Sequence, residues 1–150
     1  MERPEPIRAV IDTQQYIYAL SPGSPSEQVV LAMAGRTFDV VTTDAILREA
    51  QDTLHYVRTK QPIPASYIEN LLGYLQKFGH RVSPIERLRV VKEDPDDDKF
   101  IEAAVAGQAR FLVTDDRHLR RLKSYRGTEI VTAKQFLSAI GQPWRRREGM

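Results

Sequence analysis

The chain contains no cysteine in its 150 residues. This absence excludes disulfide bonds and thiolate metal sites, and it is typical of a protein in the reducing cytoplasm, where we expect this one. Histidine is scarce, and His55, His80 and His118 lack the i, i+4 spacing of a helical metal site. Any metal must therefore be held by oxygen or imidazole ligands.

Long apolar runs are also missing. No stretch of about 18 apolar residues occurs, so we expect no transmembrane helix and no membrane partner. The opening residues Met-Glu-Arg-Pro-Glu-Pro lack the basic-then-apolar order of a secretory signal peptide. There is no internal repeat, Gly-rich phosphate loop, Ser-His-Asp order or RNA-binding aromatic motif, which removes several common functional classes.

The body of the chain has no excess of either charge sign. The sequence has 22 Lys and Arg residues against 20 Asp and Glu, a net charge of +2. The segment Arg145-Arg146-Arg147-Glu148 accounts for this whole excess and leaves 19 basic and 19 acidic residues elsewhere. The tail is either a solvated, mobile end, which we favour, or a binding arm for an anionic partner.

What the sequence does contain is an alternation of strand-like and helix-like segments. Its length and 41% apolar content fit one domain, which we assign to residues 7–141, between a flexible N-terminus (1–6) and a basic tail (142–150). We expect strands at 7–11, 38–42, 88–91, 111–114 and 129–132. We expect helices at 14–20, 25–34, 44–59, 66–78, 96–106, 118–122 and 133–140. This alternation predicts a three-layer α/β/α sandwich with a mostly parallel central sheet.

Acidic residues gather where strands end and helices begin. Asp12 follows the first strand, Thr114-Asp115-Asp116 ends another, and Asp94-Pro95-Asp96-Asp97-Asp98 opens the helix at 96–106. In such folds ligands bind outside the carboxyl ends of the strands. Carboxylates that converge there repel one another unless a cation lies between them. The pattern predicts a divalent metal site, a kind that commonly acts on phosphate, with the Thr114 hydroxyl orienting a ligand or water.

Each of these features also has a simpler interpretation. Asp12 and Asp116 could be turn or N-cap residues, and acids at a helix start stabilise it through its dipole. Four acids in five residues nevertheless exceed what capping requires. Glu49 lies either at the border of the apolar face of its helix or in solvent. The basic segment after Asp116 is either a short amphipathic helix or a phosphate-binding element, or both; its arginines are Arg117, Arg120 and Arg121.

Taken together, these segments resemble a PIN domain, the metal-dependent ribonuclease fold of many type II toxin–antitoxin toxins, over about residues 8–140. The resemblance is carried by Val10–Thr13, Thr43–Glu49, Asp94–Phe100, Phe111–Leu119 and Ile130–Leu137. It implies an endoribonuclease that hydrolyses RNA phosphodiester bonds with Mg²⁺ or Mn²⁺. It also implies a homodimer and a cognate antitoxin that blocks the acidic crevice.

The resemblance further implies a catalytic acidic quartet. Its members are Asp12, Glu49, Asp97 and Asp116, with Asp98 as the alternative to Asp97 if the helix register shifts by one residue. Asp12 and Asp116 would bind the metal directly, Asp97 or Asp98 directly or through water, and Glu49 would position metal-bound water.

Two positions depart from the family pattern. Asn usually follows Asp-Thr, and its amide helps to organise the site; here the longer Gln14 stands there, so activity could be reduced or lost. His118 replaces a frequent but peripheral acid. Two rival functions follow. One is a degenerate RNA- or partner-binding module without catalysis. The other is a small-molecule phosphohydrolase with Asp12 as nucleophile, although that chemistry usually requires a second acid where Gln14 lies.

Overall fold

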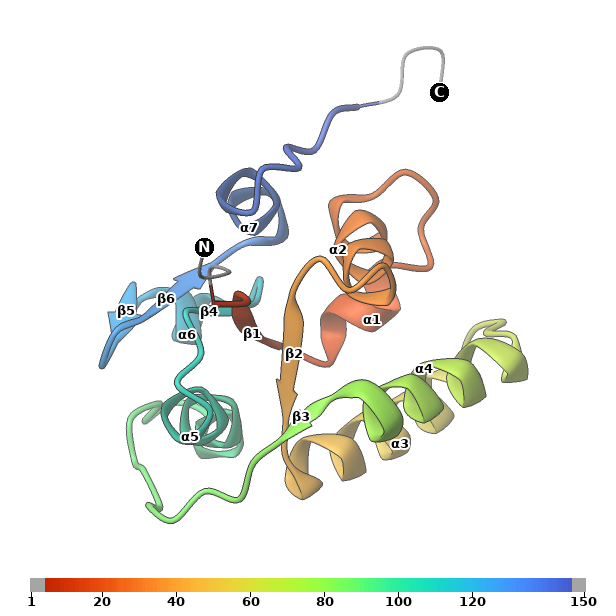
Figure 1. The fold of residues 1–150 in the computed structure, drawn as a ribbon. Helices are drawn as coiled ribbons and strands as arrows, with labels where there is room; N and C mark the ends of the chain where they lie inside the picture. The colour runs from red at the N-terminus through yellow and green to blue at the C-terminus, as the bar shows by residue number, and fades with distance from the viewer. Residues whose placement is uncertain (1–4, 147–150) are drawn as a thin grey trace.

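A central six-stranded sheet carries the fold in the computed structural model, which describes residues 5–146 (Figure 1). Its order is β3-β2-β1-β4-β6-β5, and every neighbouring pair is parallel except β5 and β6. This confirms the expected mostly parallel sheet. The expected flexible N-terminus and basic tail lie partly outside the described residues. The strands are β1 (Arg8–Ile11), β2 (Asp39–Thr42), β3 (His80–Arg81), β4 (Phe111–Val113), β5 (Ser124–Tyr125) and β6 (Thr128–Val131).

Four of the helices in the described residues, α2, α3, α6 and α7, begin at a residue whose side chain caps them. Ser24 Oγ accepts a hydrogen bond from the Glu27 N–H, and Thr43 Oγ1 accepts one from the Ile46 N–H. In the described part of the chain, no helix has both the length and the apolar character needed to cross a membrane. The helices are α1 (Gln14–Tyr18), α2 (Pro25–Ala34), α3 (Asp44–Arg58), α4 (Ala65–Phe78), α5 (Asp98–Ala106), α6 (Arg117–Arg120) and α7 (Ala133–Ala139), with a 3₁₀ turn η1 (Pro95–Asp97).

Apolar side chains cover both faces of the sheet because successive strand residues point to opposite sides. Ala9 and Ile11 of β1 pack in the cluster that includes α2 and α7, whereas Val10 packs on the opposite side with Phe100 of α5. In the pairing of β1 with β4, Ile11 lies opposite Val113. The residues that follow these two strands, Asp12 and Thr114, therefore lie side by side at the carboxyl edge of the sheet.

One expected strand is wrong. Residues 88–91 form no strand, and β3 occupies the sheet edge beside β2 instead. The reason is that side chains of α5 take the backbone N–H groups of this segment. Glu102 Oε2 accepts from the Leu88 N–H, and Asp98 Oδ1 accepts from the N–H groups of Val90 and Val91. The helix expected at 118–122 also begins and ends earlier, as α6.

Candidate functional site

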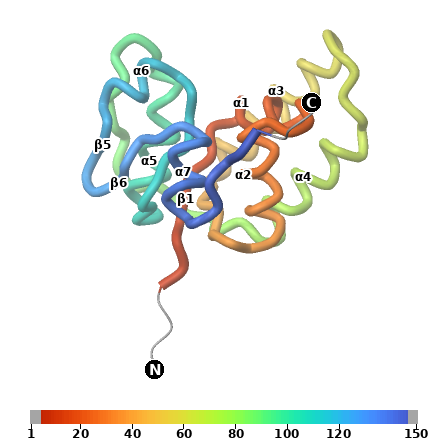
Figure 2. The backbone as a smooth tube through the Cα atoms, turned by 90° about the horizontal axis from the view of Figure 1, so that it is seen from above, coloured from red at the N-terminus to blue at the C-terminus, as the bar shows by residue number. Residues whose placement is uncertain are grey.

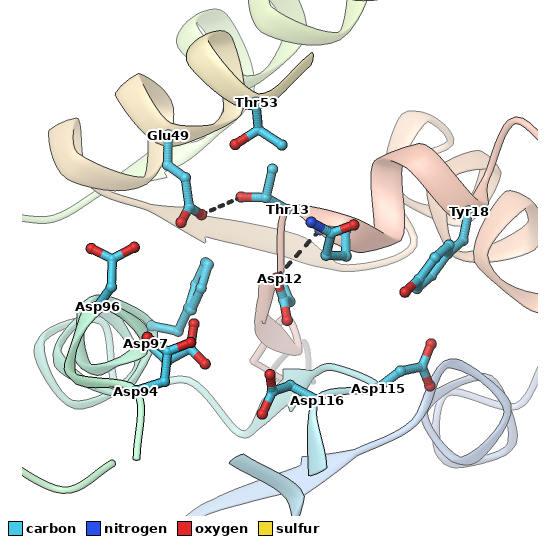
Figure 3. Close-up of a pocket in the computed structure, with 12 residues that line it drawn as sticks. Asp12, Thr13, Tyr18, Glu49, Thr53, Asp94, Asp96, Asp97, Asp115 and Asp116 are labelled. Carbon is cyan, nitrogen blue, oxygen red and sulfur yellow. Dashed lines mark hydrogen bonds between the residues drawn. The ribbon is translucent and has the colours of Figure 1, made fainter. Parts of the chain in front are cut away.

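A cavity of about 310 Å³ lies at the carboxyl ends of β1 and β4 (Figure 3). Its carboxylates come from five places along the chain: the end of β1, helix α3, the segment before η1, η1 itself and the loop after β4. The cavity is lined by Asp12, Thr13, Gln14, Tyr18, Glu49, Thr53, Asp94, Asp96, Asp97, Phe100, Asp115 and Asp116. The fold thus brings all four members of the expected quartet to one cavity.

Asp12 is fixed at the floor of the cavity by its neighbours. Its Oδ2 accepts a hydrogen bond from the Thr114 hydroxyl at 2.7 Å, and its Oδ1 accepts one from the Gln14 backbone N–H at 3.3 Å. Burial raises the pKa of Asp12, the hydrogen bonds from Thr114 and Gln14 oppose this rise, and the charges of Glu49 and Asp116 add to it. Thr114 is fully buried, so it serves as a positioning residue.

Three other carboxylates converge at the cavity, and among the described residues one of them is left with an unpaired buried oxygen. Asp94, Asp97 and Asp116 each place one carboxylate oxygen within 4.8 Å of the others. Within residues 5–146, the buried Oδ2 of Asp97 has no hydrogen-bond partner. Burial, and then the charges of the surrounding carboxylates beginning with Asp94, raise the pKa of Asp97 to about 7. This cluster is therefore electrostatically unfavourable until a proton or a cation neutralises part of it.

Asp116 has two roles that use different atoms. Its Oδ1 caps α6 by accepting hydrogen bonds from the backbone N–H groups of His118 and Leu119, as the capping interpretation expected. Its own N–H donates to Thr114 Oγ1 at 3.0 Å. Thr114 therefore links Asp12 to the loop that carries Asp116, and the capping bonds hold the Asp116 carboxylate beside the cavity.

Glu49 reaches the cavity from α3 and is held on both oxygens. Thr13 Oγ1 donates to Oε2 at 2.6 Å, and Lys99 Nζ donates to Oε1 at 2.9 Å. Lys99 also donates to Asp96 Oδ2 at 3.1 Å. Burial lowers the pKa of Lys99, but its bonds to Glu49 and Asp96 outweigh this and raise it. The Lys99 ammonium group thus neutralises part of the negative charge of Glu49 and Asp96 at this side of the cavity.

Asp98 is turned away from the acidic cavity. The residue is 6% exposed, and its Oδ1 accepts hydrogen bonds from the N–H groups of Val90 and Val91. The structure does not bring Asp98 to this cavity, because the side chain bonds the 88–91 segment instead, and its role as an alternative ligand stays a prediction. Of the two alternatives Asp97 and Asp98, it is Asp97 that lines the cavity, together with Asp94 and Asp96 of the same run.

The predicted RNA-binding arginines lie outside the cavity lining. Arg117, Arg120 and Arg121 are exposed on α6 and directly after it. Arg121 lies 3.7 Å from Glu93 across an exposed ion pair. Their contact with RNA stays a prediction.

The sequence analysis missed three contributors. Asp94 was counted only as part of the acidic run, although it converges with Asp97 and Asp116. Lys99 follows that run directly in the sequence, and its positive charge beside four acids could have indicated that it pairs with them. Gln15 is fully buried, accepts from Ser26 Oγ at 2.7 Å and donates to Asp115 Oδ2 at 3.1 Å, so it braces one acid of the cavity wall. Nothing in the local sequence distinguished Gln15 from Gln14.

The donor set fits a hard divalent cation. Every candidate ligand is a carboxylate oxygen, and the unpartnered Asp97 Oδ2 is a buried acceptor in the converging cluster. Mg²⁺ and Mn²⁺ prefer such oxygen ligands, whereas the sulfur and imidazole donors typical of zinc sites are absent from the lining.

Comparisons with known proteins agree with this fold. One of six solved chains with significant similarity comes from the crystal structure of VapBC2 from Rickettsia felis bound to a DNA fragment from their promoter. The match has a TM-score of 0.51 and 14% sequence identity, and it covers 83% of this chain and 97% of that chain. No curated protein matches. The PIN domain family model matches residues 8–118. The chain therefore belongs to the PIN domain family.

Proposed function

We propose that this protein is a divalent-metal-dependent endoribonuclease. The observation that carries the proposal is the convergence of Asp94, Asp97 and Asp116 beside the fixed carboxylate of Asp12, in a cavity at the carboxyl edge of the sheet. Membership of the PIN domain family supports a nuclease, and the resemblance described above supplies the preference for RNA.

Four carboxylates would hold the metal. Asp97, Asp116 and Asp94 offer converging oxygens, and Asp12 offers a carboxylate positioned by Thr114. When bound, Mg²⁺ or Mn²⁺ supplies charge neutralisation at the scissile phosphate and lowers the pKa of water.

The protein residues provide orientation and proton control. Thr13 and Lys99 hold Glu49 in place, so that its carboxylate can orient a water molecule for in-line attack. Lys99 keeps positive charge beside this wall and limits the repulsion that a phosphate would meet there. Tyr18, which is 46% exposed, contributes aromatic surface to the lining, which suits a nucleotide base next to the cleaved bond.

The proposed assembly includes a cognate antitoxin protein and a homodimer, both of which the family resemblance implies. An antitoxin that blocks the acidic cavity would have to present positive charge to it. Coexpression with a candidate partner, followed by light scattering and a cleavage assay, tests both parts. A clean monomer at high concentration would contradict the homodimer.

The central experiment compares single carboxylate replacements in a cleavage assay on single-stranded RNA with Mn²⁺. Asp12→Asn, Asp97→Asn and Asp116→Asn should each lower the cleavage rate by at least about 100-fold, because each removes a candidate ligand. Asp98→Asn is the matched control: it changes the charge equally, one residue from Asp97, on a side chain turned away from the cavity. Unchanged cleavage in Asp12→Asn or Asp116→Asn would contradict the mechanism.

Two further measurements separate the rival functions. Calorimetric titration with Mn²⁺ should show binding to the wild-type protein and its loss in Asp97→Asn. A protein that binds no Mn²⁺ and cleaves no RNA would instead be a non-catalytic binding module. Turnover of a generic aryl phosphate would favour a small-molecule phosphohydrolase.

A further inference from the structure

The segment that follows α7 is fixed to the domain. The Trp144 Nε1–H donates to the Gly23 carbonyl at 2.9 Å, and Gln28 Nε2 donates to the Gln142 carbonyl at 2.8 Å. Lys134 Nζ lies 4.6 Å from the centre of the indole ring. Figure 2 shows the chain after α7 running past α2. The backbone up to Trp144 is thus anchored on α2 and on the loop before it.

That loop connects the anchor to the rim of the acidic cavity. It follows α1 directly, and both the Ser24 hydroxyl and the Ser21 N–H donate to the Tyr18 carbonyl, at 3.1 and 3.0 Å. Tyr18 ends α1, lines the cavity and is 46% exposed. The loop therefore links the Trp144 anchor, through Gly23 and Ser24, to the backbone of Tyr18, a residue that lines the cavity.

Two arginines extend from this anchor. Arg145 and Arg146 are exposed, and no ion pair engages either of them among the residues from 5 to 146. Two residues span at most about 7 Å, so both arginines stay close to the fixed indole. In the sequence, the run that they begin, residues 145–148, carries the whole net charge of the chain. Two exposed arginines without an acidic partner among the described residues are suited to bind a polyanion.

We propose that Arg145 and Arg146, positioned by Trp144, bind phosphate groups of single-stranded RNA where the strand leaves the cavity past Tyr18. The Tyr18 ring would stack on a base, and the guanidinium groups would contact the backbone, a combination typical of single-strand recognition. This inference rests on the proposed function for the identity of its ligand. The anchor is the feature that favours a binding arm over a solvated end.

The test measures RNA binding without cleavage. Asp97→Asn serves as the background, and a fluorescent single-stranded RNA of about 12 nucleotides is titrated by anisotropy at several salt concentrations. Adding R145A/R146A should weaken binding on the order of tenfold near 0.1 M salt and reduce the slope of log K against log salt by about 1.4. R36A/R110A is the matched control, because these exposed arginines precede β2 and β4 at the opposite edge of the sheet.

The anchor is tested separately. Trp144→Phe keeps a ring for Lys134 but removes the N–H that bonds Gly23, and Trp144→Ala removes both contacts. Both variants should weaken RNA binding although both arginines remain, and Trp144→Ala should do so more. Melting temperatures of these variants, and Mn²⁺ titration in otherwise wild-type protein, establish that the domain and its metal site persist.

Three outcomes would overturn the inference. One is a loss in R145A/R146A no larger than that in R36A/R110A, which would show a net-charge effect. Another is full RNA affinity in both Trp144 variants. The third is tail-dependent binding of poly-glutamate without tail-dependent binding of RNA, which would assign the arm to an acidic polypeptide. Tail-dependent RNA binding by a protein that cleaves no RNA would instead support the inference and contradict only the proposed nuclease function.

Discussion

The acidic cavity has two walls that treat their carboxylates differently. On one wall, Asp12 and Glu49 accept hydrogen bonds from Thr114, Thr13 and Lys99. On the other, Asp94, Asp97 and Asp116 converge, and a buried oxygen of Asp97 has no partner in the described chain. We call these the bonded wall and the open wall.

We infer that one wall mainly orients the reactants and that the other mainly determines metal affinity. The bonded wall is held by protein donors, so its geometry needs no metal to be established. The open wall is unfavourable on its own, because three carboxylates converge there and burial disfavours the charge of Asp97. Metal affinity and its pH dependence should therefore depend mainly on the open wall. The precise placement of the reactants should depend mainly on the bonded wall.

The largest effect that we expect on the bonded wall comes from Thr114→Val. This change removes the donor to Asp12 and the acceptor for the Asp116 N–H while it keeps the shape of the side chain. RNA cleavage should fall about 10- to 100-fold, as is typical when a residue that orients a metal ligand is lost. The unfolding free energy should fall by about 1–3 kcal/mol, because Asp12 is left with an unsatisfied buried oxygen.

Thr42→Val is the matched control for this prediction. Thr42 is also buried on a central strand, but its Oγ1 has no hydrogen-bond partner within the described residues. The same substitution there should leave cleavage unchanged and stability unchanged or higher. Equal losses in both variants would show that the effect of Thr114→Val is a general packing defect.

On the open wall, the expected effect is a pH dependence of metal binding. The pKa of Asp97 is raised to about 7, and a bound cation requires the ionised form. Mn²⁺ affinity, measured by calorimetry, should therefore fall about tenfold for each pH unit below about 7, with release of about one proton on binding. An affinity that stays constant between about pH 5.5 and pH 7 would contradict the assignment of Asp97 as a ligand.

The same pKa gives a stability prediction for the metal-free protein. Because the folded-state pKa of Asp97 lies above the ordinary value of 3.8, its contribution to stability is present at low pH. That contribution is lost as the pH rises through about 7. Asp97→Asn should therefore raise the melting temperature relative to wild type at pH 8, and the difference should shrink towards pH 4.

Within both walls, the carboxylates differ in how well the sequence predicted their position. Asp12 and Asp116 could be placed because each follows a strand, and neighbouring parallel strands deliver such residues to one edge. The sequence could not decide between Asp97 and Asp98, because a shift of one residue in the helix register determines which carboxylate lines the cavity. The structure places Asp97 there. The strand expected at 88–91 is wrong for a different reason: the side chains of Asp98 and Glu102 take its N–H groups, and local strand propensity does not encode such contacts with a neighbouring helix.

A smaller effect is expected from Lys99→Met. The substitution keeps much of the aliphatic stem but removes the ammonium group that bonds Glu49 and Asp96. Cleavage should fall on the order of tenfold, because Glu49 loses one of its two fixed contacts and the wall becomes more negative. Mn²⁺ affinity should change less than cleavage, since Lys99 does not contact the open wall. Lys92→Met, on an exposed loop residue, controls for the lost charge.

The smallest effect is expected from Gln14→Asn, which restores the residue usual in the family. The bond that position 14 makes to Asp12 comes from its backbone N–H, and Asn and Gln supply that donor equally. The Gln14 side chain is exposed at the cavity lining, so its extra methylene displaces no buried neighbour. We therefore expect the cleavage rate to change by less than about threefold, within the range of ordinary surface substitutions. A gain of a hundredfold in the same assay would show that the amide itself organises the reactants, and that the bonded wall is incomplete in this chain.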